Sequence, residues 1–181
     1  VVAITGSNGK STTTALAGAL LRAAGRTVAV CGNIGTPLVA CVDGPPERVF
    51  VVELSSFQLE GTDTFRPRAA ALLNVSPDHL DRHGSLAAYV AAKRRIFLRQ
   101  GTGDTAVLNA DDPWVAATAV AGARRRLFSS TGAVDDGCAL TDGVVIETGD
   151  GSPRELFALA DLPLAGTHNL ENAMAAALLA R

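Results

Sequence analysis

A glycine-rich segment near the start of the chain has the residue types and spacing needed to bind a polyphosphate. It reads Gly-Ser-Asn-Gly-Lys-Ser-Thr over residues 6–12, directly after the apolar run 1–5 and directly before a helical pattern. Glycines let backbone N–H groups turn toward a phosphate, the Lys10 ammonium supplies positive charge, and the Ser11 hydroxyl can bind Mg²⁺. The start of the following helix adds partial positive charge. The pattern predicts a nucleoside triphosphate bound by Gly6, Asn8, Gly9, Lys10, Ser11 and Thr12.

The match to the general pattern G-x-x-x-x-G-K-[ST] is incomplete, because Ile4 stands where the first glycine belongs. A surface turn with a solvated lysine is the alternative. The position of the segment between an apolar run and a helical pattern favours phosphate binding.

Polar side chains also follow other apolar runs. Glu53 comes after the run 49–52, and Asn33 and His79 follow further expected strands. Ligands of parallel α/β sheets bind beyond the carboxyl ends of the strands, so these side chains are expected to meet in space. A carboxylate at a strand end beside a phosphate-binding loop is in the expected place for a Mg²⁺ ligand. We predict that role for Glu53, the alternative being a carboxylate in water.

Two histidines, His79 and His83, stand four residues apart in the polar segment 78–83, a spacing that also occurs in zinc sites. Proline before the segment and glycine after it indicate a loop rather than a continuous helix, so zinc is the weaker interpretation. The stronger one is that His79 lies close to a Mg²⁺-bound phosphate. A solvated loop of mixed charge is the alternative for His83 and Asp81.

Lys93 lies in a helical pattern that runs from Leu86 to about Arg99. Spacings of three and four residues put it on the apolar stripe of that helix. Lysine is almost never fully buried unless it is paired. Lys93 is therefore either a snorkelling side chain or a desolvated amine of lowered pKa. The nearby His79 favours the second interpretation.

The last helical pattern opens with His168, Asn169 and Asn172. Asparagine at a helix start is an ordinary cap, although such a group can also bind the edge of an adenine. From the spacing alone, capping is the stronger interpretation.

These residues require a fold that brings strand ends together. Apolar strand patterns recur at 1–5, 27–31, 49–54, 69–75, 105–109 and 126–128. Helical patterns lie between them, including one that ends at Gly25 and a short one over 113–120. This alternation predicts an α/β fold with a mostly parallel P-loop-type sheet and helices on both faces. The Gly- and Asp-rich residues 132–163 predict a small antiparallel addition with strands near 144–147 and 156–159.

Composition restricts the class of protein. A chain of 181 residues with 48% hydrophobic residues is expected to form one domain. The net charge of −2 gives no electrostatic footprint for nucleic acid, and we interpret the run Arg124–Arg126 as a solvated helix-to-strand junction. No apolar stretch is long enough for a membrane span. The three cysteines lack metal spacing and are expected to be reduced, which suits the cytoplasm.

Together these motifs resemble those of the Mur ligases, the ATP-dependent amino-acid-adding enzymes of peptidoglycan synthesis. The matching pieces extend from the first expected strand to the last helix, at residues 6–12, 32–35, 74–81, 91–93, 109–112 and 168–169. Within the family, Glu-Leu-Ser-Ser-Phe-Gln-Leu-Glu at 53–60 is similar to the members that join D-glutamate to UDP-N-acetylmuramoyl-L-alanine. Ser7 is a mild departure, since the family most often has threonine there.

The resemblance implies that residues 1–181 form a central ATPase domain cut from a longer chain. Family members have a preceding domain for the UDP-substrate and a following domain that closes over ATP, and neither is in this sequence. The implied reaction transfers a phosphoryl group from ATP to a carboxylate and then forms an amide with D-glutamate. The implied full-length protein is cytoplasmic and monomeric.

Carried over position by position, the resemblance implies roles for the residues singled out above. Lys10 and its loop hold the phosphates, Ser11 and Glu53 bind a first Mg²⁺, and His79 and a carbamylated Lys93 serve a second. The implied catalytic residues are Lys10, Lys93 and His79. Asn33 and Ser55 match substrate-contacting positions. Asn169 and Asn172 match adenine-side asparagines, which reverses the interpretation from spacing.

Two other functions remain open at this stage. One is a different amide ligase, such as a folylpolyglutamate synthase, although the run Ser-Ser-Phe-Gln at 55–58 speaks against it. The other is a binding module that uses ATP to change partners. Phosphate release that depends on substrate separates an enzyme from such a switch.

Overall fold

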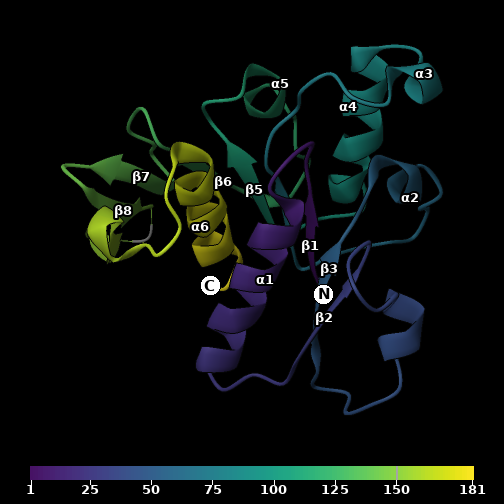
Figure 1. The fold of residues 1–181 in the computed structure, drawn as a ribbon, viewed down its shortest axis with the longest axis horizontal. Coiled ribbons are helices and arrows are strands. Elements are labelled where there is room, and N and C mark those ends of the chain that lie inside the picture. The colour runs from purple at the N-terminus through teal and green to yellow at the C-terminus, as the bar shows by residue number, and fades with distance from the viewer. Residues whose placement is uncertain (150) are drawn as a thin grey trace.

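The computed structural model describes residues 1–149 and 151–181. Its strands form one sheet in the order β2-β3-β1-β4-β5-β6-β7-β8-β9 (Figure 1). Strands β1 to β7 pair in parallel, whereas β8 runs antiparallel to both β7 and β9. The strands are β1 Val2–Thr5, β2 Val28–Gly32, β3 Val49–Glu53, β4 Ala69–Leu72, β5 Thr105–Asn109, β6 Arg124–Ser129, β7 Gly137–Thr141, β8 Val144–Thr148 and β9 Arg154–Ala158.

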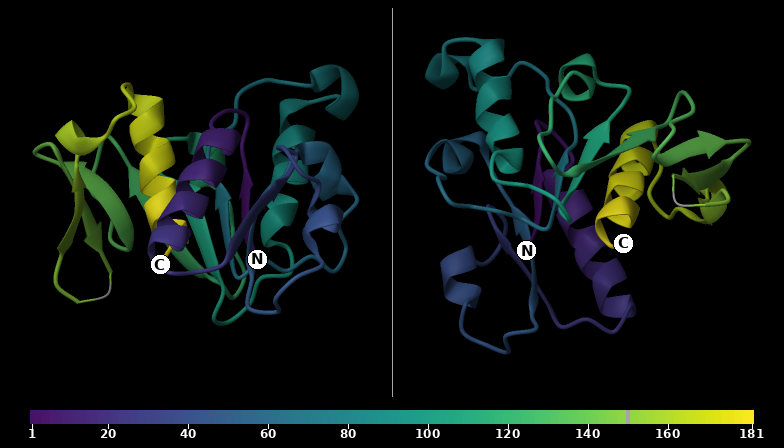
Figure 2. Two further views of the ribbon diagram at one scale, coloured as in Figure 1. Left: turned by 60° about the horizontal axis from the view of Figure 1, so that its bottom comes forward. Right: turned by 180° about the vertical axis from the view of Figure 1, so that it is seen from behind.

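Helices cover both faces of the sheet (Figure 2). They are α1 Lys10–Ala23, α2 Ser56–Glu60, α3 Leu80–His83, α4 Leu86–Arg94, α5 Pro113–Ala116 and α6 Thr167–Leu179, with 3₁₀ turns at Leu38–Cys41, Arg95–Phe97 and Leu159–Asp161. Helices α1 and α6 lie side by side on one face, and α2 and α4 lie on the other. None of the described helices is long and apolar enough to span a bilayer.

Alternate residues of the central strands serve the two faces. In β1, Ile4 belongs to the core beneath α1 and α6, whereas Ala3 belongs to the core beneath α2 and α4. Both are fully buried, as are Val51 and Val52 in β3 and residues 70–71 in β4. A strand covered on both faces is apolar throughout, which explains the continuous apolar runs in the sequence.

The predicted fold class is confirmed, and several element boundaries were wrong. The helical pattern after Leu86 continues only to Arg94 as an α-helix and then tightens into a 3₁₀ turn. Helix α5 ends at Ala116 rather than near residue 120. The antiparallel addition is present, and its strand β7 was not predicted.

The interpretation of residues 124–126 as a solvated junction was wrong for Arg126, whereas Arg125 is exposed and Arg124 is half-buried. They open strand β6, and Arg126 is 5% exposed. Its guanidinium group lies between the carboxylates of Asp136 and Glu147, so a buried ion network has replaced the expected solvation.

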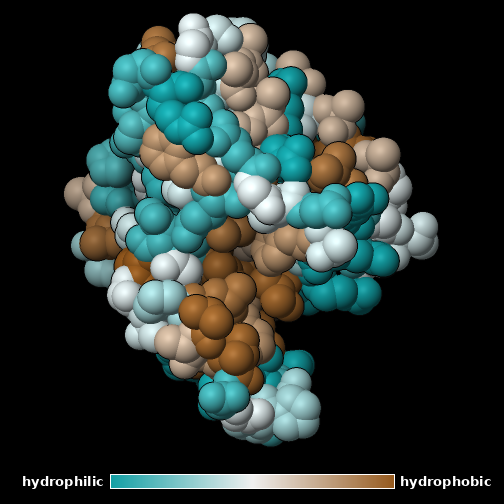
Figure 3. All heavy atoms as spheres, turned by 90° about the vertical axis from the view of Figure 1, so that its right-hand side faces the viewer, coloured by the Kyte–Doolittle hydropathy of each residue, from teal (hydrophilic) through white to brown (hydrophobic). Residues whose placement is uncertain are grey.

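Strand β2 forms an outer edge of the sheet, and that side of the molecule faces the viewer in Figure 3. Apolar surface is visible there. The 3₁₀ turn Leu38–Cys41 packs next to β2, and Val39 and Val42 are 78% and 58% exposed. The opposite edge carries the antiparallel strands β8 and β9.

Candidate active site

The loop predicted to bind phosphate connects β1 to α1 at the carboxyl edge of the sheet. Gly9 ends the loop with φ of 81°, and a side chain there would place its Cβ 2.1 Å from Asn172 Oδ1. Within the described chain, no side chain caps the N-terminus of α1, so its first N–H groups are free for an anion. Lys10 Nζ donates to the carbonyl oxygens of Gly6 and Ser7 at 3.0 and 2.9 Å. A positive charge and free N–H groups therefore face the same loop.

Asn74, which follows β4, holds this loop in shape. Its side-chain oxygen accepts from the Asn8 N–H at 2.8 Å, and its amide nitrogen donates to the Asn8 carbonyl at 3.1 Å. Its own carbonyl accepts from the Ser7 N–H. The sequence marked Asn74 as part of a motif without giving it this supporting role.

Glu53, at the end of β3, meets two of the predicted site residues. Its carboxylate accepts from the Ser11 hydroxyl at 2.7 Å and from the Asn33 amide at 3.1 Å, and the residue is 3% exposed. Hydroxyl and carboxylate oxygens are ligands that Mg²⁺ accepts, usually together with phosphate oxygens and water. Among the described residues, no group of three or more His, Cys, Asp or Glu could hold a metal by itself. The Ser11–Glu53 pair therefore fits a Mg²⁺ that is shared with a nucleotide.

Lys93 is buried beneath the loop. The residue is 1% exposed, and its Nζ donates to the Gly6 carbonyl at 2.8 Å and lies 4.4 Å from the centre of the Tyr89 ring. Burial, together with the nearby charge of Lys10, lowers the pKa of Lys93 to about 7, and Asp78 opposes this shift in part. Near neutral pH a large share of these amines is uncharged, as reaction with CO₂ requires.

His79 lies near the Tyr89 ring, which Lys93 also contacts. It precedes α3 in the left-handed conformation with φ of 50°, and its side chain is 49% exposed. Its ring nitrogen Nε2 is 3.5 Å from an Asp78 carboxylate oxygen, and its ring centre is 6.4 Å from that of Tyr89. His79 is open to solvent and to a ligand, unlike the lysine.

His83 contradicts the interpretation of a solvated loop. Its side chain is 1% exposed, with Nε2 3.0 Å from the Ser56 hydroxyl and Nδ1 3.2 Å from Glu60 Oε1. The segment also forms the helical turn α3, where a loop was expected. His83 therefore ties α3 to α2 and is no partner of His79 in a zinc site.

Ser55 caps α2. Its hydroxyl accepts from the Gln58 N–H at 3.2 Å, while the Gln58 side chain accepts from the Ser55 N–H at 2.9 Å. This capping box places Ser55 two residues beyond Glu53, on the site side of β3.

The two asparagines of α6 differ in position. Asn172 is 4% exposed, accepts from the Thr13 hydroxyl at 3.2 Å and touches Gly9, whereas Asn169 is half-buried and donates to the Ala165 carbonyl. Gly166 occupies the cap position of α6 without a side-chain cap, so the capping interpretation was wrong. Thr12 is half-buried in the first turn of α1.

A polar cleft of about 390 Å³ lies beside the loop and includes residues that sequence reasoning left without a role. Burial would raise the pKa of Asp111, but hydrogen bonds from Ser129, Thr131 and Ser130 hold it below its ordinary value. Burial and the charge of Asp111 raise the pKa of Glu171, which faces the same cleft. The polar run Asn-Ala-Asp-Asp, which starts at the last residue of β5, was the signal that could have identified this cleft.

Comparisons with known proteins agree with this geometry. The Mur ligase middle domain matches residues 4–180. UDP-N-acetylmuramoylalanine–D-glutamate ligase of Pelotomaculum thermopropionicum is 47% identical over all of this chain and 40% of its own length. The enzyme of the same name from Frankia casuarinae is 50% identical over 99% of this chain and 38% of its own length. The chain thus spans about two fifths of these relatives.

Solved structures show the same fold. UDP-N-acetylmuramoyl-L-alanyl-D-glutamate–2,6-diaminopimelate ligase superposes with a TM-score of 0.74 at 25% identity, over 97% of this chain and 41% of that one. The UDP-N-acetylmuramoylalanyl-D-glutamyl-2,6-diaminopimelate–D-alanyl-D-alanyl ligase from Acinetobacter baumannii superposes with a TM-score of 0.72 at 23% identity. The superposition covers 99% of this chain and 42% of that one. A family match across nearly the whole chain and relatives near 50% identity lead to one conclusion: this chain belongs to the Mur ligase family.

Proposed function

We propose that this chain is the central, ATP-using domain of a longer ligase that joins D-glutamate to UDP-N-acetylmuramoyl-L-alanine during peptidoglycan synthesis. The names of the relatives at 47% and 50% identity support these substrates. The observation that carries the chemistry is the Ser11–Glu53 pair beside the predicted phosphate-binding loop. The Gly6 carbonyl of that loop accepts a hydrogen bond from the buried Lys93. We further propose that the protein works as a monomer in the cytoplasm.

The reaction has two steps. A carboxylate oxygen of UDP-N-acetylmuramoyl-L-alanine attacks the γ-phosphorus of ATP, the bond to the bridging oxygen breaks, and ADP leaves. The amine of D-glutamate then attacks the acyl carbon, phosphate leaves with the electron pair of its bond to carbon, and the nitrogen loses a proton to give the amide. Both steps bring negatively charged groups together, so the site must neutralise charge.

The phosphate-side residues supply that neutralisation. Lys10 and the free N–H groups of α1 bind the phosphate oxygens, and Ser11 and Glu53 hold a first Mg²⁺. Bound Mg²⁺ would withdraw negative charge from the phosphates. Asn169 and Asn172, from α6, are proposed to lie on the adenine side, and Asn172 already contacts the loop.

Lys93 and His79 are proposed to serve a second Mg²⁺. The neutral Lys93 amine attacks CO₂, a C–N bond forms, and one proton is released to water, which leaves a carbamate anion in place of a cation. Its lowered pKa and its burial support this reaction. Asn33 and Ser55 are proposed to contact the UDP-substrate.

The test is phosphate release by the full-length protein. We expect release from ATP to require Mg²⁺, UDP-N-acetylmuramoyl-L-alanine and D-glutamate together. Release with another amino acid but not D-glutamate would indicate a different ligase of the family. ATP binding that changes partner affinity without substrate-dependent release would instead indicate a nucleotide-controlled binding module.

A further inference from the structure

A second polar cavity, of about 320 Å³, lies at the antiparallel edge of the sheet, away from the phosphate-binding loop. Its lining residues come from β6, β8 and β9, from Ser152 between β8 and β9, and from Arg181 just beyond the end of α6. The lining residues are Arg126, Glu147, Thr148, Ser152, Arg154 and Arg181. The reaction proposed above uses none of them.

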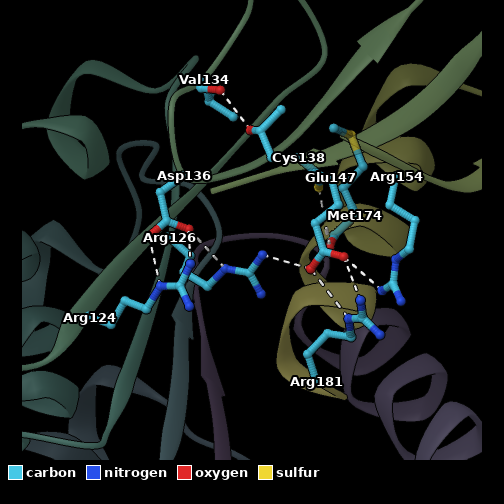
Figure 4. A network of polar contacts seen from close by, with 10 residues as sticks. Arg124, Arg126, Val134, Asp136, Cys138, Glu147, Arg154, Met174 and Arg181 are labelled. Atoms are coloured by element: carbon cyan, nitrogen blue, oxygen red, sulfur yellow. Dashed lines mark hydrogen bonds and ion pairs between the residues drawn. The ribbon is translucent and has the colours of Figure 1, made fainter. Parts of the chain in front are cut away.

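Three guanidinium groups in this cavity share one carboxylate. Arg126 and Arg154 each donate to a different oxygen of Glu147 at 2.7 Å, and Arg181 donates to both oxygens (Figure 4). The Glu147 side chain is 12% exposed. Arg126 alone of the three extends to a second carboxylate, that of Asp136 at 3.3 Å, among the residues that the structure describes. Positive charge is therefore in excess around Glu147.

The arginines also have N–H donors to spare. Each guanidinium carries five N–H groups, and within residues 1–149 and 151–181 the Nη1 groups of Arg126, Arg154 and Arg181 have no hydrogen-bond partner. The Arg126 side chain is 6% exposed, and among the described residues its Nη1 is not one of the enclosed side-chain atoms that lack a partner, so this group is open to the cavity. A largely buried guanidinium with an unused donor that faces a polar cavity has the chemistry to bind an anion.

We propose that this cavity binds a phosphate-type oxyanion, either free phosphate or the phosphate group of a small phosphomonoester. Guanidinium groups match tetrahedral oxyanions because two parallel N–H donors can meet two oxygens. The site is separate from the proposed nucleotide site. Asn172 contacts the loop before α1, and from Asn172 helix α6 extends for about 10 Å to its end, close to Arg181 in the cavity wall.

A purely structural network is the competing explanation, and Glu147 distinguishes the two. In such a network the carboxylate only holds β8 and β9 against β6 and α6, so Glu147→Gln would lower stability and leave phosphate binding absent. In an anion site the same carboxylate competes with the ligand for the three arginines. Glu147→Gln would then lower stability and strengthen phosphate binding, two effects of opposite sign.

The experiment is calorimetric titration of the full-length protein with inorganic phosphate and, separately, glycerol 3-phosphate. Saturating Mg²⁺ and a non-hydrolysable ATP analogue keep the phosphate-binding loop occupied. We expect saturable binding that Arg154→Gln weakens about tenfold and Glu147→Gln strengthens several-fold. Arg99→Gln is the matched control, because Arg99 is 53% exposed and paired with one carboxylate, as Arg154 is at 52%. It should leave the affinity unchanged.

Stronger binding of glycerol 3-phosphate than of phosphate would support the proposal with a phosphomonoester as the ligand, and equal binding would support it with free phosphate. No saturable binding in the presence of the ATP analogue would overturn it. Saturable binding that neither Arg154→Gln nor Glu147→Gln alters would also overturn it, because the ion would then be held elsewhere.

Discussion

Both carboxylate oxygens of Glu53 accept hydrogen bonds from other residues of the candidate site. Glu53→Gln keeps the shape and loses the hard anionic ligand, so we expect substrate-dependent phosphate release to fall on the order of a hundredfold. The Mg²⁺ concentration for half-maximal rate should rise. Initial rates across a Mg²⁺ series would measure both, and an unchanged Mg²⁺ dependence would place the metal elsewhere.

Lys93 should make the stability of the protein depend on pH. The folded protein releases the Lys93 proton near pH 7, whereas the unfolded chain keeps it up to about pH 10.5. Between these values the unfolded state binds more protons, so this residue makes the free energy of unfolding rise with pH. Below about pH 7 both states are protonated and the cost of burying the charge is present in full.

Lys93→Met removes this titration and serves as the comparison. Urea unfolding of both proteins in CO₂-free buffer between pH 6 and 9.5 should give a stability difference that shifts in favour of Lys93 as the pH rises. Parallel curves would show that Lys93 keeps an ordinary pKa.

The chemical form of Lys93 has its own test in the full-length protein. Lys93→Ala should abolish most of the activity, and acetate should restore part of it by supplying an anion to the vacated space. Lys93→Arg should be inactive and insensitive to acetate, because guanidinium stays cationic and does not take up CO₂. Full activity of Lys93→Arg would return this lysine to a packing role.

Between elements, the loop before α1 fits tightly against α6. Gly9→Ala forces a side chain onto Asn172 at a φ of 81°, and we expect it to lower the free energy of unfolding by about 2–3 kcal/mol. Combining it with Asn172→Ala relieves the steric part and leaves the backbone strain. Urea unfolding of both single variants and the double variant should show that the two losses do not add. Additive losses would mean that the two residues do not interact.

His83 connects α3 to α2 through Ser56 and Glu60. His83→Phe keeps a ring but leaves the buried Ser56 hydroxyl without a partner, so we expect a loss of about 2 kcal/mol in unfolding free energy. Arg82→Gln is the control on the same helix, because Arg82 is exposed and also contacts Glu60; its effect should stay within about 0.5 kcal/mol. Equal effects of the two changes would show that burial of His83 contributes nothing.

At the scale of the whole molecule, the sequence was informative where local pattern and structure coincide. The apolar runs predicted strands because the sheet is covered on both faces, and the helical stripe predicted the burial of Lys93 because that helix packs on the sheet. Arg126 and His83 were misjudged because their partners are distant in sequence, and a polar residue looks solvated until those partners are known. Strand β7 was missed because it begins at Gly137, within a run typical of turns.

The contact between Gly9 and Asn172 also has a consequence for biosynthesis. The two residues are separated by most of the chain, and helix α6 flanks α1 on the same face of the sheet. As the chain emerges from the ribosome, β1 and the loop come first, but the side chain that closes the space beside Gly9 comes only after the entire sheet has been made. The nascent protein therefore cannot complete its proposed nucleotide site early, and until α6 arrives the side of α1 that packs against α6 is exposed to chaperones and proteases.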